Sequence, residues 1–218
     1  MKYIVFGFAC IVLFFVFVFA SSYYKDKQLE KFDFMAKEDA SIFVRDHSPT
    51  LGNDDAKVYL IEFMDPACET CAAFSPLVKK LMNDNPGKIK LVLRYAPFHD
   101  GADYFVKILE AAQKQGKYWE TLEVMYKSQP YWASHHNPQP YKIWQFLTRA
   151  GLDLEQIRKD MEDPEIVEIM EQDLADAERL DVRKTPGFFV NGRPLQTFGY
   201  PQLQQLINDE INKQYPNQ

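Results

Sequence analysis

Two cysteines separated by two residues stand between a strand-like and a helix-like stretch of the chain. The apolar stretch 58–63 indicates a buried strand, Cys68 and Cys71 follow it, and the apolar spacing after them predicts a helix over 74–82. A helix that begins at the pair places Cys68 at its N-terminus, where free amide groups and the helix dipole stabilise a thiolate. The i, i+3 spacing puts Cys71 on the same helical face. We therefore expect thiol–disulfide exchange, with Cys68 as the exposed nucleophile and Cys71 as the buried resolving thiol.

Composition narrows the class of protein. The chain has 218 residues, of which 46% are hydrophobic and 26% charged, as in a globular protein with a core of its own. Its net charge is −6, with acidic and basic residues interspersed, which argues against a nucleic-acid partner. The acidic stretch 162–178 is expected to be a solvated helix face. The third cysteine, Cys10, does not complete a second pair, so we expect no metal site and no cofactor.

An apolar stretch begins the chain. Met1 and Lys2 precede the uncharged residues 3–20, which as a helix would span about 27 Å, close to the hydrocarbon thickness of a bilayer. We expect residues 1–24 to be an uncleaved anchor in the cytoplasmic membrane, because the apolar part of a cleaved signal peptide is shorter. A cleaved signal peptide is the alternative. Either case sends the domain across the membrane, and the redox cysteine pair that follows indicates that the domain is exported.

The rest of the chain divides into a linker and one domain. Residues 25–49 are expected to form a helical stalk that ends in a turn-rich boundary at 48–55, and residues 50–218 the domain. In chain order we expect the strand and helix around the cysteines, a strand at 89–95, a helical insertion at about 100–180, a strand at 187–190, the turn Asn191-Gly192, a return strand at 193–196 and a helix at 200–215. This order predicts a thioredoxin-like α/β fold with a helical insertion.

Two further features belong to the predicted site. Glu62 lies six residues before Cys68 on the incoming strand, and a carboxyl group buried beneath the cysteines can move protons to and from the resolving thiol. The alternative for Glu62 is a carboxylate that points into solvent. Thr185-Pro186 precedes the late strand, where a cis proline in a thioredoxin-type site packs against the cysteines and leaves backbone groups free to pair with an extended substrate.

Several segments together resemble the DsbA-like thioredoxin-fold family. They are Leu51-Gly52-Asn53-Asp54-Asp55-Ala56-Lys57-Val58 leading into Ile61-Glu62-Phe63, Gly116-Lys117-Tyr118-Trp119-Glu120, and residues 180–192 with Thr185-Pro186-Gly187-Phe188-Phe189. The similarity covers roughly residues 50–212. It implies a bacterial periplasmic protein that exchanges disulfides with other proteins, with Thr185-Pro186 as the cis-proline loop and Glu62 as the buried acid.

The dipeptide between the cysteines departs from the family's strong oxidants, which carry a histidine there. Here it is Glu69-Thr70. A negative charge at Glu69 should raise the pKa of Cys68 and favour the disulfide over the thiols. We therefore expect a weaker oxidant than the strongest members, or a reductant.

The expected partners are exported protein substrates, a membrane or periplasmic redox partner, and the membrane itself. Two other functions use the same features differently. A copper- or metal-handling protein would bind the metal through Cys68 and Cys71. A non-catalytic periplasmic chaperone would use the aromatic-rich part of the insertion as a binding surface.

Overall fold

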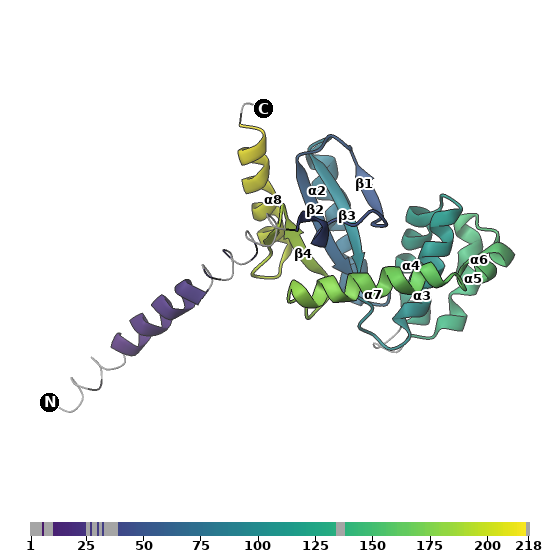
Figure 1. Ribbon diagram of the computed structural model, residues 1–218, viewed down its shortest axis with the longest axis horizontal. Helices are drawn as coiled ribbons and strands as arrows, with labels where there is room; N and C mark the ends of the chain where they lie inside the picture. Colours follow the sequence, from purple (N-terminus) through teal and green to yellow (C-terminus); the bar gives the residue numbers. More distant parts are fainter. Residues whose placement is uncertain are drawn as a thin grey trace.

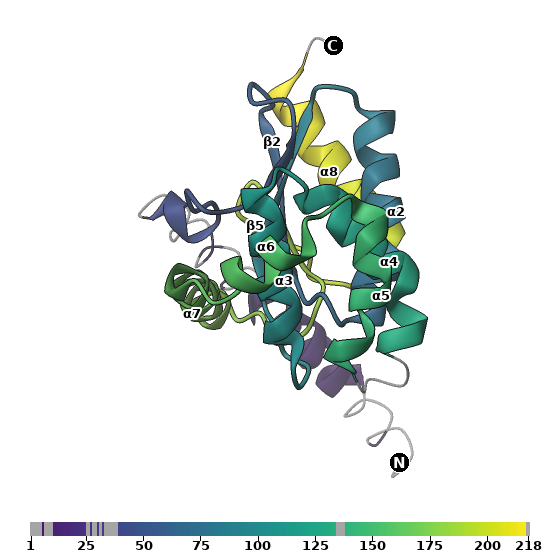
Figure 2. The same cartoon turned by 90° about the vertical axis from the view of Figure 1, so that its right-hand side faces the viewer.

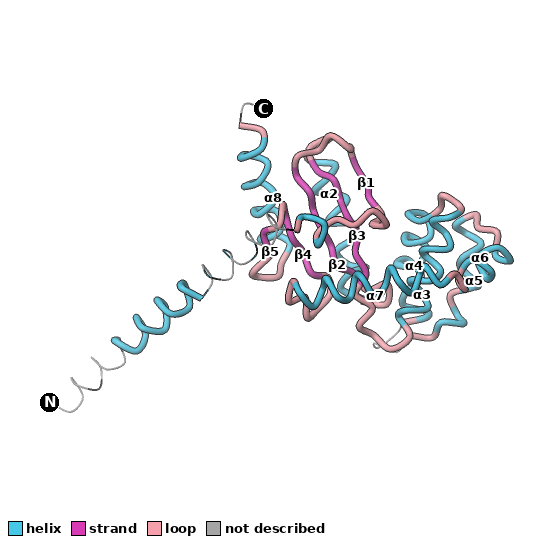
Figure 3. Tube along the Cα trace, viewed as in Figure 1, coloured by secondary structure: helices cyan, strands magenta, loops and turns pink. Residues whose placement is uncertain are grey.

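The computed structural model describes residues 39–133 and 138–216, and before them residues 6, 11–24, 27, 30 and 32. Five strands form one mixed sheet in the order β1-β3-β2-β4-β5 (Figure 3). They are β1 (Thr50–Gly52), β2 (Val58–Met64), β3 (Ile89–Tyr95), β4 (Gly187–Val190) and β5 (Arg193–Pro194). The predicted α/β class is confirmed.

The central strands β2 and β3 run parallel, and nearly all their residues are buried. Such near-continuous apolar strands are typical of a sheet covered on both faces. Glu62 on β2 lies opposite Leu93 on β3 and Phe188 on β4. Because successive strand residues point to opposite faces, Glu62 and Phe63 lie on different sides of the sheet.

Helices cover both faces of this sheet. Figure 2 shows α2 and α8 on one side of it and α7 on the other, and Figure 1 shows α3 to α6 gathered beside it. The helices are α2 (Glu69–Asp84), α3 (Ala102–Lys114), α4 (Tyr118–Trp132), α5 (Trp144–Leu147), α6 (Leu154–Asp160), α7 (Pro164–Arg179) and α8 (Tyr200–Gln214), with short 3-10 turns η1 (Ala40–Ile42), η3 (Pro140–Lys142) and η4 (Thr148–Ala150). The helices α3 to α7 lie where a helical insertion was predicted.

The two faces have separate apolar clusters. On the first, Leu60 and Met64 of β2 pack with Val78 of α2 and with the helical insertion. On the second, Ile61 and Phe63 pack against η1 and the C-terminal end of α7. The cysteine pair belongs to the first cluster.

A network of buried charges fills part of the second face. Arg94 of β3 is fully buried and donates to Asp173 (2.8 Å) and Asp176 (2.6 Å) of α7 and to the carbonyl oxygen of Ile42 (2.7 Å). Arg45 donates two further hydrogen bonds of 2.8 Å to Asp176. The expectation that the acidic stretch 162–178 is wholly solvated is therefore wrong at Asp173 and Asp176, because arginines of other segments bury and pair these carboxylates.

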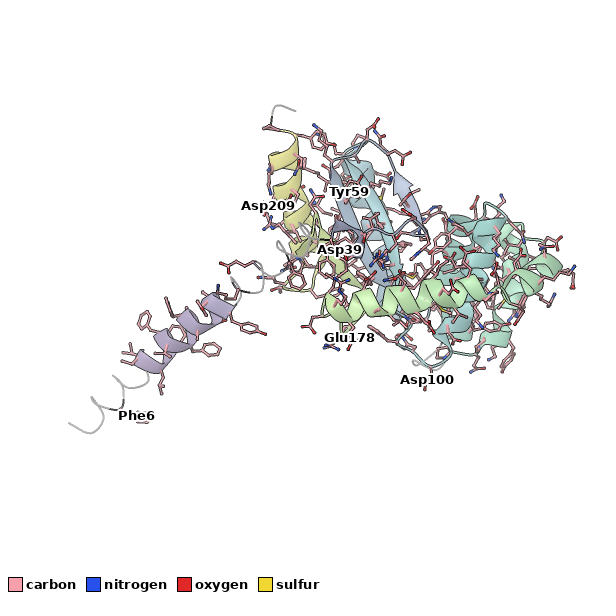
Figure 4. The ribbon with its side chains drawn as sticks, viewed as in Figure 1. Phe6, Asp39, Tyr59, Asp100, Glu178 and Asp209 are labelled. Atoms are coloured by element: carbon pink, nitrogen blue, oxygen red, sulfur yellow. The ribbon has the colours of Figure 1, made fainter. Side chains whose placement is uncertain are left out.

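The segment before the domain is described only in part. Residues 11–24 are helical, and their apolar side chains project on all sides (Figure 4). Within the described residues, no helix is both long and apolar enough to cross a membrane, so the anchor over 1–24 stays a prediction. Cys10 and most of the predicted stalk at 25–38 lie outside the described residues. Phe32 packs edge-on against Phe189 of β4, with ring centroids 5.7 Å apart.

Three local expectations need correction. The turn-rich boundary at 48–55 contains the strand β1, which pairs antiparallel with β3. The helix predicted over 74–82 is longer and covers Glu69–Asp84, and its start confirms the expected place of Cys68 at the N-terminus. The return strand after Asn191-Gly192 ends at Pro194, although it is the expected edge strand. Pro194 has no amide hydrogen to donate, but the amide of Leu195 still donates to the carbonyl oxygen of Phe188 at 2.9 Å.

Candidate active site

The backbone places Cys68 at the N-terminus of a helix. Cys68 is the N-cap residue of α2, with φ −74° and ψ 118°, and its sulfur accepts a hydrogen bond from the amide of Cys71 at 3.4 Å. The first amides of a helix lack intrahelical acceptors, so a thiolate at this point satisfies one of them. Both cysteines are free thiols in this structure.

The surroundings of Cys68 lower the pKa of its thiol. The hydrogen bond with Cys71 is the largest cause that lowers the pKa of Cys68, to about 5. Burial opposes it, and hydrogen bonds with the side chain of Thr185 and with the backbone of Cys71 and Thr70 add to the lowering. The thiolate is therefore the main form of Cys68 near neutral pH.

The exposure of Cys68 differs from the prediction. Only 5% of Cys68 is exposed, compared with 0% of Cys71. The predicted exposed nucleophile is therefore nearly covered, because the Thr185 loop lies against its sulfur. The predicted buried position of Cys71 is confirmed.

Cys71 has the opposite electrostatic environment. Burial is the main cause that raises its pKa well above the usual value, and the hydrogen bond with Cys68 and the charge of Glu62 add to it. Cys71 therefore holds its proton when Cys68 has lost its own. Two thiols with pKa values this far apart can take separate roles in exchange.

The Thr185-Pro186 loop faces Cys68. The peptide bond between these residues is cis, and the carbonyl oxygen of Thr185 lies 3.4 Å from the sulfur of Cys68, close enough to accept a hydrogen bond from the thiol. A groove of about 810 Å³ runs beside this loop, lined among others by Thr70, Pro186 and the half-exposed ring of Phe198. The structure thus brings the predicted loop and the cysteines together.

Glu62 is buried, so the alternative of a solvent-facing carboxylate is wrong. It is 4% exposed, and its carboxyl group makes no hydrogen bond or ion pair with any residue that the structure describes. Burial is the main cause that raises the pKa of Glu62 to about 8, and the charge of Cys68 adds to it. A carboxyl group with a pKa near neutrality can both take up and release a proton.

The expectation that Glu69 raises the pKa of Cys68 is wrong in its net result. Glu69 and Thr70 are exposed in the first turn of α2, so water screens the charge of Glu69. The hydrogen bonds to the sulfur act at contact distance and lower the pKa instead.

Sequence reasoning missed Asp65, which is fully buried three residues before Cys68. Its carboxylate accepts from the amides of Ala67 (2.8 Å) and His99 (2.9 Å) and lies 2.7 Å from Nδ1 of His99. Its carbonyl oxygen accepts from the amide of Cys68 at 3.0 Å. Asp65 therefore fixes the turn that positions Cys68. The dipeptide Asp65-Pro66 is itself a turn signal that could have identified it.

No group of three or more potential ligand side chains that could hold a metal ion occurs among the described residues.

Comparison with known proteins places this site in a family. The sequence profile described as Thioredoxin matches residues 45–209. The chain belongs to the thioredoxin family. The probable disulfide bond formation protein D of Bacillus anthracis is 27% identical over 184 residues, which are 79% of this chain and 82% of that protein. The resemblance to DsbA-like thiol–disulfide oxidoreductases is thereby confirmed.

A solved structure supports the fold. A thioredoxin-like oxidoreductase from Silicibacter pomeroyi DSS-3 is 28% identical, with a TM-score of 0.69, and the match covers 80% of this chain and 98% of that one.

The family domain also occurs in longer proteins. The Na(+)/H(+) antiporter NhaA of Herminiimonas arsenicoxydans is 30% identical over 145 residues, which are 66% of this chain. The matched part is 22% of the antiporter's length, so this chain corresponds to a minor part of that relative.

Proposed function

We propose that this protein is a thiol–disulfide oxidoreductase that exchanges disulfides with exported proteins through Cys68 and Cys71. The observation that carries the proposal is the position of Cys68, which caps α2 and lies 3.4 Å from the carbonyl oxygen of Thr185. One reacting sulfur therefore borders a loop that can pair with an extended polypeptide.

The reaction balances with the groups present. In the oxidising direction, a substrate thiolate attacks the sulfur of Cys68 in the Cys68–Cys71 disulfide. The S–S bond breaks, a mixed disulfide forms, and Cys71 leaves as a thiolate that takes a proton from Glu62. A second substrate thiolate then attacks the substrate sulfur of the mixed disulfide and releases Cys68 as a thiolate. The substrate gains a disulfide, and the cysteine pair gains the two electrons.

The electrostatics of Cys68 favour the oxidising direction. A pKa lowered to about 5 stabilises the reduced form with its thiolate relative to the disulfide. The sequence-based expectation of a weaker oxidant than the family's strongest members, or of a reductant, stays a prediction. A redox partner must then reoxidise the pair, and we place that partner and the substrates on the periplasmic side of the cytoplasmic membrane, with residues 1–24 as the anchor.

The groove beside Thr185 is the proposed substrate site. Its exposed Phe198 ring packs on Phe74 of α2, with centroids 4.6 Å apart, and Pro186 forms part of the same wall. An apolar wall beside a reactive sulfur suits unfolded chains, whose cysteines are flanked by exposed apolar residues.

The experiment is a trap of the mixed disulfide. The Cys71→Ser variant cannot resolve a mixed disulfide, so it should accumulate substrate proteins on Cys68 that a reducing agent releases. The matched control is Cys68→Ser, which should trap none. Equal trapping by both variants, or a wild-type chain that forms no Cys68–Cys71 disulfide in a glutathione buffer, would refute the proposal.

A further inference from the structure

The groove beside the Thr185-Pro186 loop is lined in part by residues that precede the domain. Ser21, Tyr24 and Phe32 belong to its lining, and all three lie before residues 45–209, which match the family profile. The N-terminal segment therefore supplies groove surface that the matched family domain does not contain.

Phe32 attaches the N-terminal segment to the sheet. It is 5% exposed, and its ring packs edge-on against the ring of Phe189, a residue of β4 that also lines the groove. Phe32 belongs to the apolar cluster on the second face of the sheet. Because β4 begins directly after the Thr185-Pro186 loop, this contact holds part of the N-terminal segment next to the loop that borders Cys68.

Tyr24 differs from Phe32, because most of its surface is open to solvent. It is 66% exposed and lines the groove, and the half-exposed ring of Phe198 lines the same groove. Exposed aromatic surface marks binding sites, and tyrosine is enriched among the residues that carry most of the energy of polypeptide interfaces. The groove thus offers one ring from the N-terminal segment and one from the C-terminal part of the domain.

An extended polypeptide suits this groove better than a small thiol does. The carbonyl oxygen of Thr185 lies 3.4 Å from the sulfur of Cys68, and a backbone group in this position can pair with an extended chain. The groove has a volume of about 810 Å³, which lies within the range of roughly 300–1,000 Å³ for sites that hold drug-sized ligands. It therefore has room for a substrate cysteine and for the residues that flank it.

We propose that Tyr24 is a substrate-binding residue that selects polypeptides with a large apolar side chain next to the reactive cysteine. That side chain packs against the rings of Tyr24 and Phe198 while the substrate cysteine reacts with Cys68. The inference rests on the proposed function and names the class of its substrates. A small thiol reaches Cys68 without this contact, so Tyr24 affects the rate for such polypeptides alone.

Oxidation of two short peptides tests the proposal. Each peptide carries two cysteines, and the residues on both sides of the first cysteine are phenylalanine in one peptide and serine in the other. The oxidised full chain, kept in solution with a mild detergent, is mixed with either peptide or with dithiothreitol. The two peptide thiols become a disulfide as the Cys68–Cys71 disulfide becomes two thiols. The loss of peptide thiols, measured after an acid quench, gives the second-order rate constant.

The test compares Tyr24→Ala with the matched control Tyr23→Ala. Tyr23 is the adjacent residue and is 60% exposed, but it is not among the described residues that line the groove. Tyr24→Phe is the conservative variant, because it keeps the ring and removes only the hydroxyl group.

We expect Tyr24→Ala to lower the rate constant for the phenylalanine peptide by about tenfold, as for the loss of one aromatic contact at an interface. The rate constants for the serine peptide and for dithiothreitol should stay at the wild-type values, which also shows that the variant is folded. Tyr24→Phe should restore the rate for the phenylalanine peptide. Tyr23→Ala should match the wild type with all three reductants.

An unchanged rate constant for the phenylalanine peptide in Tyr24→Ala overturns the proposal. So does an equal loss in Tyr23→Ala, in Tyr24→Phe, with the serine peptide or with dithiothreitol, because the effect would then not come from a contact between the Tyr24 ring and an apolar side chain. A wild-type chain that oxidises neither peptide would instead contradict the proposed function, so the two failures are distinguishable.

Discussion

The two faces of the central sheet differ in whether a buried ionisable side chain has partners. Glu62 of β2 points to the α2 face and has no ion pair or hydrogen bond with any described residue, whereas Arg94 of β3 points to the other face and contacts two carboxylates. Both side chains are almost completely buried. They lie on adjacent strands, where Arg94 pairs in register with Phe63, the neighbour of Glu62.

The difference separates a structural role from a chemical one. A buried charge that is fully paired keeps one protonation state, because any change would leave its partners uncompensated. A buried carboxyl group without such a partner has a pKa set by burial, and here burial brings it close to neutral pH. The paired Arg94 therefore holds neighbouring segments in contact, whereas the unpaired Glu62 is suited to proton transfer.

The largest expected effect concerns the paired side. Replacing Arg94 with methionine leaves Asp173 and Asp176 buried with less compensation, and we expect a loss of about 3–5 kcal/mol in the free energy of unfolding. Urea denaturation measures it. Lys80→Met is the control, because it breaks the exposed Lys80–Asp84 pair and should leave the midpoint nearly unchanged. If Arg94→Met unfolds at the same urea concentration as Lys80→Met, the ion pairs of Arg94 do not stabilise the fold.

The next effect concerns the unpaired side. The pKa of Glu62 is raised from 4.5 to about 8, so its contribution to stability is complete below its unfolded pKa and decreases as the pH rises toward 8. Between pH 4.5 and neutrality this group should remove about 3 kcal/mol, and Glu62→Gln should abolish that slope.

Denaturation of the oxidised proteins measures this slope without a contribution from the Cys68 thiolate. Burial is the larger cause of the shift, so the slope should persist in the disulfide form. Parallel pH profiles for wild type and Glu62→Gln would contradict the assignment of Glu62 as the titrating group.

A smaller effect of opposite sign is expected at Cys68. Its pKa is lowered to about 5, so its thiolate contributes stability that is complete above the unfolded pKa and is lost as the pH falls through 5. At neutral pH this should amount to about 1–3 kcal/mol in the reduced protein, with allowance for solvent screening. Denaturation of the reduced protein across this range measures it, with Cys68→Ser as the control that should lack it. A reduced protein that is no more stable than the oxidised one at neutral pH would contradict the oxidising role.

The smallest effect concerns the exposed Glu69. Because water screens its charge, Glu69→Gln should change the pKa of Cys68 by less than about 0.5 unit. The ultraviolet absorbance of the thiolate, followed during a pH titration, measures it. A change of more than about one unit would show that the charge between the cysteines, rather than the hydrogen bonds to the sulfur, controls the pKa.

Local patterns predicted much of the fold. The apolar stretches that became β2 and β3, the turn at Asn191-Gly192 and the final helix α8 follow from periodicity and turn chemistry alone. The strand β1 was missed because its identity depends on pairing with β3, 42 residues along the chain from Thr50 to Val92, and not on its own mostly exposed residues.

The site shows the same division. The spacing of Cys68 and Cys71, their place before a helix and the position of Glu62 could be taken from the sequence. The pairing of Asp173 with Arg94 could not, because an acidic helix face looks solvated until another segment covers it. The pKa of Cys68 was misjudged because the sequence shows the charge of Glu69 but not the hydrogen bonds from Cys71 and Thr185.

The network around Arg94 also has a mechanical consequence. It ties the chain at Ile42 and Arg45, where the polypeptide enters the domain, to α7 and β3 on the face away from the cysteines. Ser21, Tyr24 and Phe32 of the N-terminal segment line the groove beside Thr185. Movement of this segment would therefore change the groove next to the reactive sulfur, whereas the ion pairs hold Arg45 against α7.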